Sequence, residues 1–373
     1  MAMVSGNEYL VFATSWVAGE DGAIVALNLN TDTGELSEVG RTTGIENPFY
    51  LALSPDRRVL YAAFVPGDFE NDSGSIGAFE IVDNSGRLRK LNEKEANGRT
   101  TCYVDVDPTG QSVVFANYTS GSIGAFSVQE DGSLGEMKSF IEHQGASMVD
   151  AERQEAAHAH CSVVSPGGRH VYVSDLGLDQ ILGYELDAGS ATLTPLDQSY
   201  VRTVGGGGPR HFTYHPHGGY VYANNELGNS VNVYSYDADR GLLVERQVIS
   251  SLPDDFEGAS STADVIVSPD GHHLYCSNRG HDSIAIYRID DGGCLTLVDH
   301  QASLGEIAQN LAITPDGKIL LCANMLADAG LGPQRESHQG ENVGVFRIDP
   351  DSGTLTPLTA PMALARPSCL VIV

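Results

Sequence analysis

The chain has 373 residues, of which 49 are Asp or Glu and 21 are Lys or Arg, so its formal net charge at pH 7 is -28. A chain this acidic lacks the basic surface that a phosphate backbone requires, and we do not expect it to bind nucleic acid. It has no apolar run of 18 or more residues and no charged-then-apolar leader after Met1, so we expect a soluble, cytoplasmic protein that has no membrane partner.

The N-terminal region predicts an incomplete unit of β-structure. Residues 9–14, 23–28 and 36–40 have the pattern of the second, third and fourth strands of a four-stranded sheet. No strand that ends in a proline turn precedes them. The first strand of this unit therefore has to come from elsewhere in the chain.

From residue 49 onward one pattern recurs six times: an apolar run, a proline-centred turn and a second apolar run. The turn prolines are 46 to 58 residues apart and are Pro55, Pro108, Pro166, Pro216, Pro269 and Pro315. Each unit contains four short strands, as the fourth shows at residues 210–215, 220–224, 230–236 and 242–248. Repeats of about fifty residues with four antiparallel strands are typical of propeller blades, because one twisted sheet cannot bury its faces alone.

The C-terminal residues 366–373 supply the missing first strand and then stop. Pairing the two ends of the chain would close the ring and remove its free edges. The sequence thus predicts an all-β fold, a seven-bladed β-propeller with four antiparallel strands per blade, formed by residues 1–373 as a single domain. It leaves the oligomeric state open between a monomer and a weak dimer.

Loop lengths indicate which end of the ring carries the site. The long insertions are residues 65–74, 142–157, 253–261 and 325–341. Each joins a second strand to a third, or a fourth strand to the first strand of the next blade, and these two kinds of connection emerge on the same face. Long loops on a rigid scaffold commonly hold the binding site, so we expect it on this face.

Comparison of the blades separates scaffold from chemistry. The residue six positions before the turn proline varies from blade to blade, and in order it is Phe49, Cys102, His160, Arg210, Ala263 and Gln309, with Ser368 in the last blade. The residue that ends the second strand is nearly constant, which is typical of local turn hydrogen bonds; it is Asn117, Asp175, Asn225, Asn278 or Asn324. The next position diverges again, to Tyr118, Leu176, Glu226 and Arg279.

The charged departures fall in consecutive blades three, four and five. They are His158, His160, Arg210, His211, Glu226, Arg279 and His281. Two arginines in one cleft of so acidic a chain predict an anion site, because opposite charges attract strongly at short range. A lone histidine is as readily a buried structural residue, however, and Glu226 with Arg279 could form a structural ion pair.

A metal site is a weaker interpretation of the same residues. His158 and His160 are two apart on a strand and point to one face, and with a third imidazole they could bind zinc. Neighbouring arginines disfavour a divalent cation, and the sequence has no His-Glu-x-x-His or Cys-x-x-Cys motif. We expect no metal and no other cofactor.

Several strings together resemble one known family. They are Ala157-His158-Ala159-His160, Gly208-Pro209-Arg210-His211-Phe212, Asn224-Asn225-Glu226-Leu227 and Ser277-Asn278-Arg279-Gly280-His281, with Ser174 to Asp179 between the first two. This combination, in this order, resembles the seven-bladed lactonase family, which includes the propeller-type 6-phosphogluconolactonase and the fungal 3-carboxy-cis,cis-muconate lactonizing enzyme. The resemblance covers essentially the whole chain.

The resemblance implies a metal-independent site in the central funnel whose working groups are His160, Arg210, Glu226 and Arg279. It adds Arg153, from the loop before the first string, as an anion ligand beside His158, His211 and His281. The implied reaction is hydrolysis of the lactone ring of a small anionic sugar acid, with Glu226 or His160 as general base on water. Arg210 and Arg279 would hold the substrate anion and the oxyanion.

Two alternatives stay open at this point. The same arginines could bind carboxylates in the cyclisation of a carboxymuconate, and propellers also serve as binding platforms without catalysis. The chain departs from the family at Ala308-Gln309-Asn310, where the family carries a Pro-Arg pair. It departs again in the first blade, where Ala63-Phe64 and a long acidic insertion at residues 67–73 replace the family's Asn-Glu. Both departures bear on the substrate more than on the reaction class.

Overall fold

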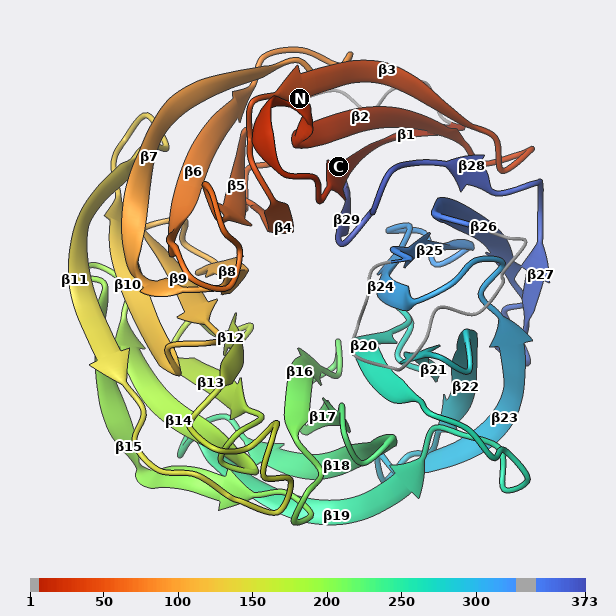
Figure 1. Cartoon of the computed structure of the whole chain (residues 1–373). Coiled ribbons are helices and arrows are strands. Elements are labelled where there is room, and N and C mark those ends of the chain that lie inside the picture. The colour runs from red at the N-terminus through yellow and green to blue at the C-terminus, as the bar shows by residue number, and fades with distance from the viewer. Residues whose placement is uncertain (1–6, 327–339) are drawn as a thin grey trace.

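The computed structural model describes residues 7–326 and 340–373 and shows seven antiparallel sheets arranged as a ring (Figure 1). The first complete blade along the chain consists of β4 (Pro48–Leu53), β5 (Val59–Phe64), β6 (Ser73–Ile81) and β7 (Leu88–Arg99). The second consists of β8 (Thr101–Val106), β9 (Ser112–Asn117), β10 (Ser122–Val128) and β11 (Leu134–Glu142). The third consists of β12 (Ala159–Val164), β13 (His170–Asp175), β14 (Gln180–Asp187) and β15 (Thr192–Arg202).

The remaining blades repeat this order. The fourth has β16 (Pro209–Tyr214), β17 (Tyr220–Asn225), β18 (Ser230–Asp237) and β19 (Leu242–Ser250). The fifth has β20 (Ser261–Val267), β21 (His273–Arg279), β22 (Ser283–Ile289) and β23 (Leu295–Ala302). The sixth has β24 (Ala308–Ile313), β25 (Ile319–Asn324), β26 (Asn342–Ile348) and β27 (Leu355–Pro357), with the short β28 (Met362–Ala363) also paired to β26. The predicted seven-bladed all-β propeller is confirmed.

The seventh blade joins the two ends of the chain. It contains β29 (Leu370–Ile372), β1 (Glu8–Ser15), β2 (Ala23–Asn30) and β3 (Leu36–Thr43), with the 3-10 turn η1 (Gly19–Asp21) between β1 and β2. The Thr14 hydroxyl accepts the backbone N–H groups of Ser368 and Cys369 at 3.0 and 2.8 Å, and Ala13 lies opposite Leu370. The predicted closure by N- and C-terminal strands is therefore confirmed, with β29 as the innermost strand of this blade.

The core lies between neighbouring sheets rather than inside any one of them. Tyr222 and Val231 of the fourth blade, for example, pack with Val265 and Leu274 of the fifth. A polar brace accompanies this packing: the Tyr222 hydroxyl donates to the Gly293 carbonyl of the next blade at 3.1 Å. The fourth blade is thus fixed against the fifth both by apolar burial and by a buried tyrosine.

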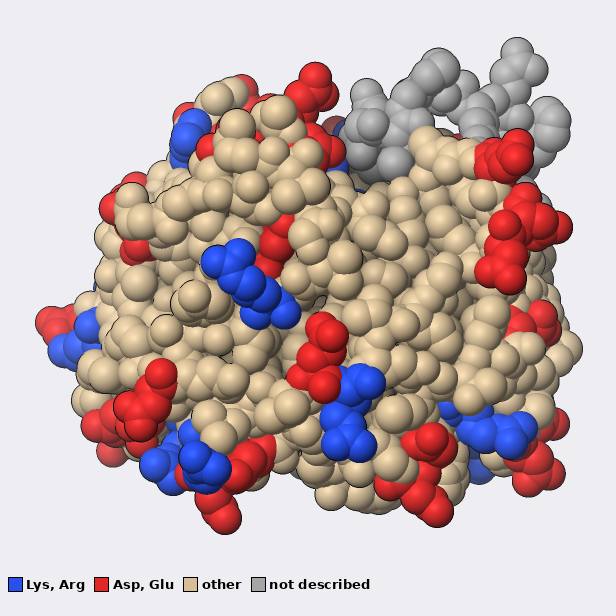
Figure 2. Space-filling view, turned by 90° about the horizontal axis from the view of Figure 1, so that it is seen from below, with Lys and Arg blue, Asp and Glu red and all other residues tan. Residues whose placement is uncertain are grey.

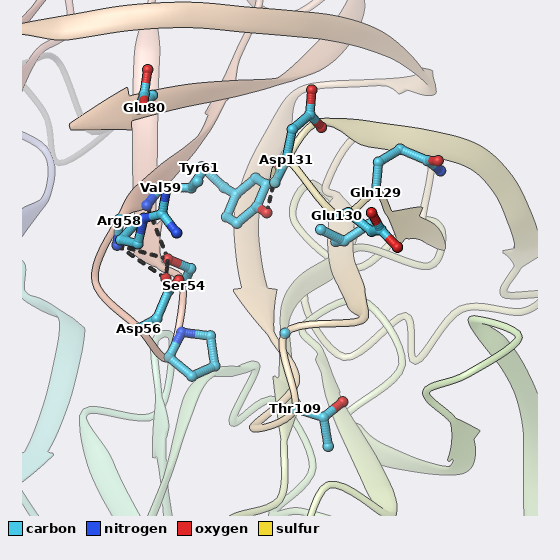
Figure 3. A pocket seen from close by; sticks show the side chains of 14 residues that line it. Ser54, Asp56, Arg58, Val59, Tyr61, Glu80, Thr109, Gln129, Glu130 and Asp131 are labelled. Carbon is cyan, nitrogen blue, oxygen red and sulfur yellow. Dashed lines mark hydrogen bonds between the residues drawn. The ribbon is translucent and has the colours of Figure 1, made fainter. Parts of the chain in front are cut away.

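The same brace is visible between the first and second blades in Figure 3. There Tyr61 donates to the Gly132 carbonyl at 2.8 Å, beside a groove of about 210 Å³ that Asp56, Arg58 and Glu130 also line. Gly132 has φ +84°, and a Cβ at this position would lie 2.5 Å from Val59. This turn therefore requires glycine on both conformational and steric grounds.

The innermost strand of each of the six complete blades has a β-bulge near its start, and these bulges help to position the site residues. In each of β4, β8, β12, β16, β20 and β24 the register against the second strand shifts near the start of the strand. In β16 the shift spans Arg210 and His211, whose side chains contact each other with 3.0 Å between Nη1 and Nε2. A bulge of this kind re-aims side chains, so two consecutive residues face the ring axis instead of one.

Among the described residues, the longer connections that the sequence places on one face are those at 65–72, 143–158 and 251–260. The fourth predicted insertion, 325–341, lies mostly outside the described residues. On the side of the ring in Figure 2, Lys and Arg are interspersed with Asp and Glu rather than gathered into one basic area. None of the helical segments in the described ranges is long and hydrophobic enough to span a bilayer.

Candidate active site

A single carboxylate organises the centre of the site. Glu226 directly follows β17 and is 3% exposed. One of its oxygens, Oε1, accepts a hydrogen bond from Arg153 Nη2 at 2.6 Å. The other, Oε2, forms ion pairs with Arg210 Nε at 3.0 Å and Arg279 Nη2 at 2.9 Å. Three guanidinium groups from three separate elements therefore meet on one glutamate.

The three arginines lie on different elements of the fold. Arg210 lies in the bulge of β16, Arg279 ends β21, and Arg153 belongs to the connection between β11 and β12. Their exposure differs as well: the Arg210 and Arg279 side chains are 1% and 9% exposed, whereas that of Arg153 is 38% exposed. Arg210 is thus enclosed by protein, whereas the Arg153 side chain is partly open to solvent.

The pKa values show how crowded this charge cluster is. Burial alone would raise the pKa of Glu226, but the charges of Arg279, Arg153 and Arg210 outweigh it and hold that pKa well below its usual range. Burial, together with the neighbouring Arg210 and Arg153 charges, lowers the pKa of Arg279 to about 10 even though Glu226 opposes the shift. One carboxylate therefore does not neutralise the three cations.

His160 lies beside the cluster. It belongs to β12, is 6% exposed, and its ring centroid is 5.4 Å from that of His211 and 5.5 Å from that of Tyr118. Its Nδ1 is buried and has no hydrogen-bond partner among the described residues. Burial, and then the charge of Arg210, hold the pKa of His160 well below the usual value for histidine, so its imidazole is neutral at neutral pH.

His158 packs against an aromatic ring at the edge of the site and, within the described ranges, does not hydrogen-bond to the guanidinium groups. Its ring stacks on Tyr118 at 4.6 Å, and its Nδ1 lies 3.1 Å from the Tyr118 carbonyl. Its backbone N–H donates to Asp175, the residue that ends β13, at 2.8 Å. Glu155 approaches the other ring nitrogen at 3.2 Å.

Tyr118 is the site residue that sequence reasoning missed. It contacts both histidines, and its hydroxyl accepts a hydrogen bond from Arg153 Nη2 at 3.2 Å. A signal for it existed, because Tyr118 occupies the same divergent position after the second strand as Glu226 and Arg279. Its side chain is uncharged, however, so a pattern of charged departures does not include it.

The last two predicted residues have different surroundings. His211 contacts Arg210 through Nε2 and Asp264 through Nδ1, at 3.0 and 2.7 Å, so it belongs to the connected group. His281 follows β21, and its ring packs against Phe256 at 4.6 Å and His300 at 5.8 Å, while Nδ1 lies 2.6 Å from the Ser283 hydroxyl. The structure joins the other seven predicted residues by direct contacts or through Tyr118, and it gives His281 an aromatic and hydroxyl environment of its own.

The opposite side of the ring centre has a different character. β4 lies across the centre from β16 in Figure 1, and Phe49 of β4 occupies the repeat position that Arg210 holds in β16. The Phe69 ring lies 5.4 Å from that of Phe49 and 5.0 Å from that of Trp16. Phe69 belongs to the acidic insertion of the first blade, so that insertion is anchored by an aromatic cluster.

No group of three or more His, Cys, Asp or Glu side chains within the described ranges is placed so that it could hold a metal ion. The imidazoles of the site instead face guanidinium groups, aromatic rings or single carboxylates.

The whole chain matches one known family. The model described as "Lactonase, 7-bladed beta-propeller" matches residues 10–372. The chain belongs to this lactonase family. The predicted resemblance is therefore confirmed across nearly the whole sequence.

Relatives of this lactonase extend over its full length. It is 31% identical over 365 residues to the 6-phosphogluconolactonase of Bacillus subtilis (strain 168), and the match covers 98% of each chain. It is also 31% identical over 352 residues to the 6-phosphogluconolactonase of Formosa agariphila, covering 93% of this chain and 94% of that one. The solved structure of the periplasmic gluconolactonase of Pseudomonas aeruginosa resembles it with a TM-score of 0.88 and 26% identity, covering 98% and 99% of the two chains.

Proposed function

We propose that this lactonase hydrolyses the ester ring of a small anionic sugar-acid lactone and needs no metal ion to do so. The observation that carries the proposal is the charge of the buried cluster: three guanidinium groups and one carboxylate, with neutral His160 beside them, leave two positive charges in excess. An anionic ligand would compensate that excess. The relatives named 6-phosphogluconolactonase and gluconolactonase point to the same class of substrate.

The different exposures of the three arginines indicate a different role for each in binding and catalysis. Arg153, which is 38% exposed, would meet the anionic group of the substrate first. Arg279 would stabilise the negative charge that develops on the carbonyl oxygen when the lactone is attacked. Arg210 is almost fully buried and would act through Glu226 rather than on the substrate.

The proton-transfer group is best assigned to His160. Both oxygens of Glu226 are taken by guanidinium groups, whereas Nδ1 of His160 has no hydrogen-bond partner among the described residues. His160 is neutral and retains a lone pair. In the proposed reaction it takes a proton from water as the water oxygen attacks the lactone carbonyl, and the imidazolium then returns that proton to the alkoxide released when the ring C–O bond breaks.

The cellular location remains part of the proposal. All six cysteines are free, and five of them are buried, which suits the reducing cytoplasm. The Pseudomonas relative is described as periplasmic, so the location has to be measured. Cell fractionation with an antibody to this chain would decide it, and recovery outside the cytoplasmic fraction would contradict the cytoplasmic assignment.

Arg279→Ala tests the proposed function directly. Because a charged donor aimed at a developing oxyanion is typically worth about 100-fold or more in turnover, we expect kcat to fall by that factor. The assay should compare 6-phosphogluconolactone, unphosphorylated gluconolactone and a carboxymuconate, since cyclisation of the last is the competing reaction.

The matched control is Arg169→Ala, which removes an arginine whose side chain is 59% exposed in an ion pair with Glu185. It should change kcat by less than about twofold, since exposed pairs contribute little. Equal activity of the Arg279 and Arg169 variants on the lactones would overturn the proposed site. Turnover of the carboxymuconate alone would overturn the proposed reaction.

A further inference from the structure

Two residues beside the charge cluster have contacts that the proposed chemistry does not use. His211 follows Arg210 in the bulge of β16, and Asp264 lies in the corresponding bulge of β20, in the next blade. Both side chains are buried, and 2.7 Å separates His211 Nδ1 from Asp264 Oδ1. No substrate contact is needed to explain this pair.

The contacts of His211 fix its tautomer. A guanidinium has only donors, so the nitrogen that faces Arg210 Nη1 at 3.0 Å, which is Nε2, has to accept. The ring proton then lies on Nδ1 and is donated to Asp264. Burial and the charge of Arg210 lower the pKa of His211, in agreement with a neutral imidazole.

Asp264 is itself held firmly by the next blade. Its Oδ2 accepts from Asn310 Nδ2 at 2.7 Å and from the backbone N–H of Leu311 at 2.9 Å, both in β24. Its Oδ1 also accepts from the backbone N–H of Val265 at 2.9 Å. A carboxylate that accepts this many hydrogen bonds is held in one orientation, and it therefore holds the His211 ring in one orientation as well.

The pair also lines a cavity that the Glu226 cluster does not reach. His211 and Asp264 line an axial cavity of about 310 Å³, together with Tyr50, Tyr103 and Asn310, and neither Glu226 nor Arg279 lines it. Arg210 Nη1 also donates to the Ala263 carbonyl in β20. Groups on one side of Arg210 thus hold Nη1, while Nε on the other side pairs with Glu226.

We propose that His211 and Asp264 form a positioning dyad that orients the Arg210 guanidinium and, through it, the Glu226 carboxylate on which the three arginines meet. The dyad spans blades four and five and makes the site depend on how these blades are packed. This inference assigns His211 a role different from substrate binding, and it rests on the proposed lactone hydrolysis for its kinetic readout. Asp264 is a residue that the sequence patterns did not select.

Two substitutions of His211 can separate its contact with Arg210 from its contact with Asp264. In His211→Asn the short side-chain amide can keep a donor near the Nδ1 position, toward Asp264, but it leaves Arg210 without its acceptor. In His211→Gln the longer side chain can place its amide oxygen near the Nε2 position and keep the acceptor for Arg210, while the contact with Asp264 is lost. Each variant therefore removes one hydrogen bond of the same histidine.

The two variants should lose similar stability but differ in turnover. We expect kcat on the best lactone to fall about tenfold in His211→Asn, where Arg210 loses its acceptor, and by about threefold in His211→Gln, where the acceptor remains but Asp264 no longer orients it. Misplacement of a site group costs rate even when binding is retained. KM should change by less than about threefold in both, since Arg153 still contacts Glu226. Equal kcat values for the two variants, with equal unfolding midpoints in urea, would overturn the dyad.

A measurement on the unaltered protein does not depend on how the variants fold. Nitrogen-15 chemical shifts of the His211 ring should show Nδ1 protonated and Nε2 unprotonated at pH 7 to 8; the opposite tautomer would overturn the inference. The Arg279→Ala variant separates this test from that of the proposed function. If Arg279→Ala keeps full activity, the proposed site fails, whereas if it loses activity and His211→Asn does not, only the dyad fails.

Discussion

The two sides of the ring centre use the same repeat position for opposite purposes. On one side, Arg210 of β16 enters a buried cluster of charges that reaches across three blades. On the other, Phe49 of β4 packs with Trp16 and Phe69 and makes a cluster of aromatic rings. The backbone is nearly the same in both places, so the difference comes from the side chains. The repeat provides the scaffold, and divergence between blades provides the chemistry.

The two sides should also differ in what a single substitution does. A buried charge is tolerated only while its partners remain, whereas aromatic packing can be reduced gradually. Substitutions on the charged side are therefore expected to affect both stability and turnover, and those on the aromatic side mainly stability.

The largest effect on stability is expected from Glu226→Ala. Its removal leaves three guanidinium groups close together without the carboxylate that holds them, and breaking a buried ion pair in this way costs about 3 to 5 kcal/mol. The free energy of unfolding from urea titrations measures it. Glu185→Ala is the control, because that glutamate is 52% exposed beside Arg169 and its loss should cost less than about 1 kcal/mol. Similar losses in the two variants would show that the cluster is not the strongly coupled unit described above.

Phe69→Ala probes the aromatic side. The side chain is partly buried against Trp16 and Phe49, so we expect a loss of about 1 to 2 kcal/mol in the free energy of unfolding. Turnover of the best lactone should stay within about twofold of the unaltered enzyme, because the ring contacts no group assigned to proton transfer or oxyanion stabilisation. A fall in kcat of tenfold without a larger loss of stability would place the aromatic side within the reacting site and remove the contrast between the two sides.

Much of the fold could be predicted from the sequence because the repeat shows the same strand and turn signals several times. The turn prolines gave six blades, and the lone C-terminal strand predicted the closure that Thr14 and Ser368 make. Comparison at equivalent positions also selected His160, Arg210, Glu226 and Arg279, because a charge at a position that is elsewhere uncharged needs an explanation. These four residues do lie together.

The arrangement of those residues could not be predicted, for a physical reason. Side chains on a regular strand alternate between faces, so Arg210 and His211 would be expected to point in opposite directions. The bulge in β16 brings Arg210 and His211 into contact, and the bulge in β20 contains Asp264, which His211 contacts. Nothing in the local sequence marks these bulges, and without them Asp264 is one more polar residue in a strand. That all three arginines meet on one glutamate also depends on contacts between blades, which the repeat alone does not specify.

The smallest expected effect is the response of turnover to mild acid, and it tests the assignment of His160. Its pKa is lowered by burial and then by Arg210, so the imidazole keeps its lone pair as the pH falls through 6.5, and activity should be lost only at lower pH. We therefore expect kcat to change by less than about twofold between pH 7.5 and 6. A histidine with the ordinary pKa of about 6.5 would instead lose roughly three quarters of its neutral form over that range. Glu226 does not interfere, because its pKa is held well below its usual range. An acid limb of kcat near pH 6.5 would contradict a buried, neutral His160 as the base, and would direct attention to a more exposed group on the charged side of the ring.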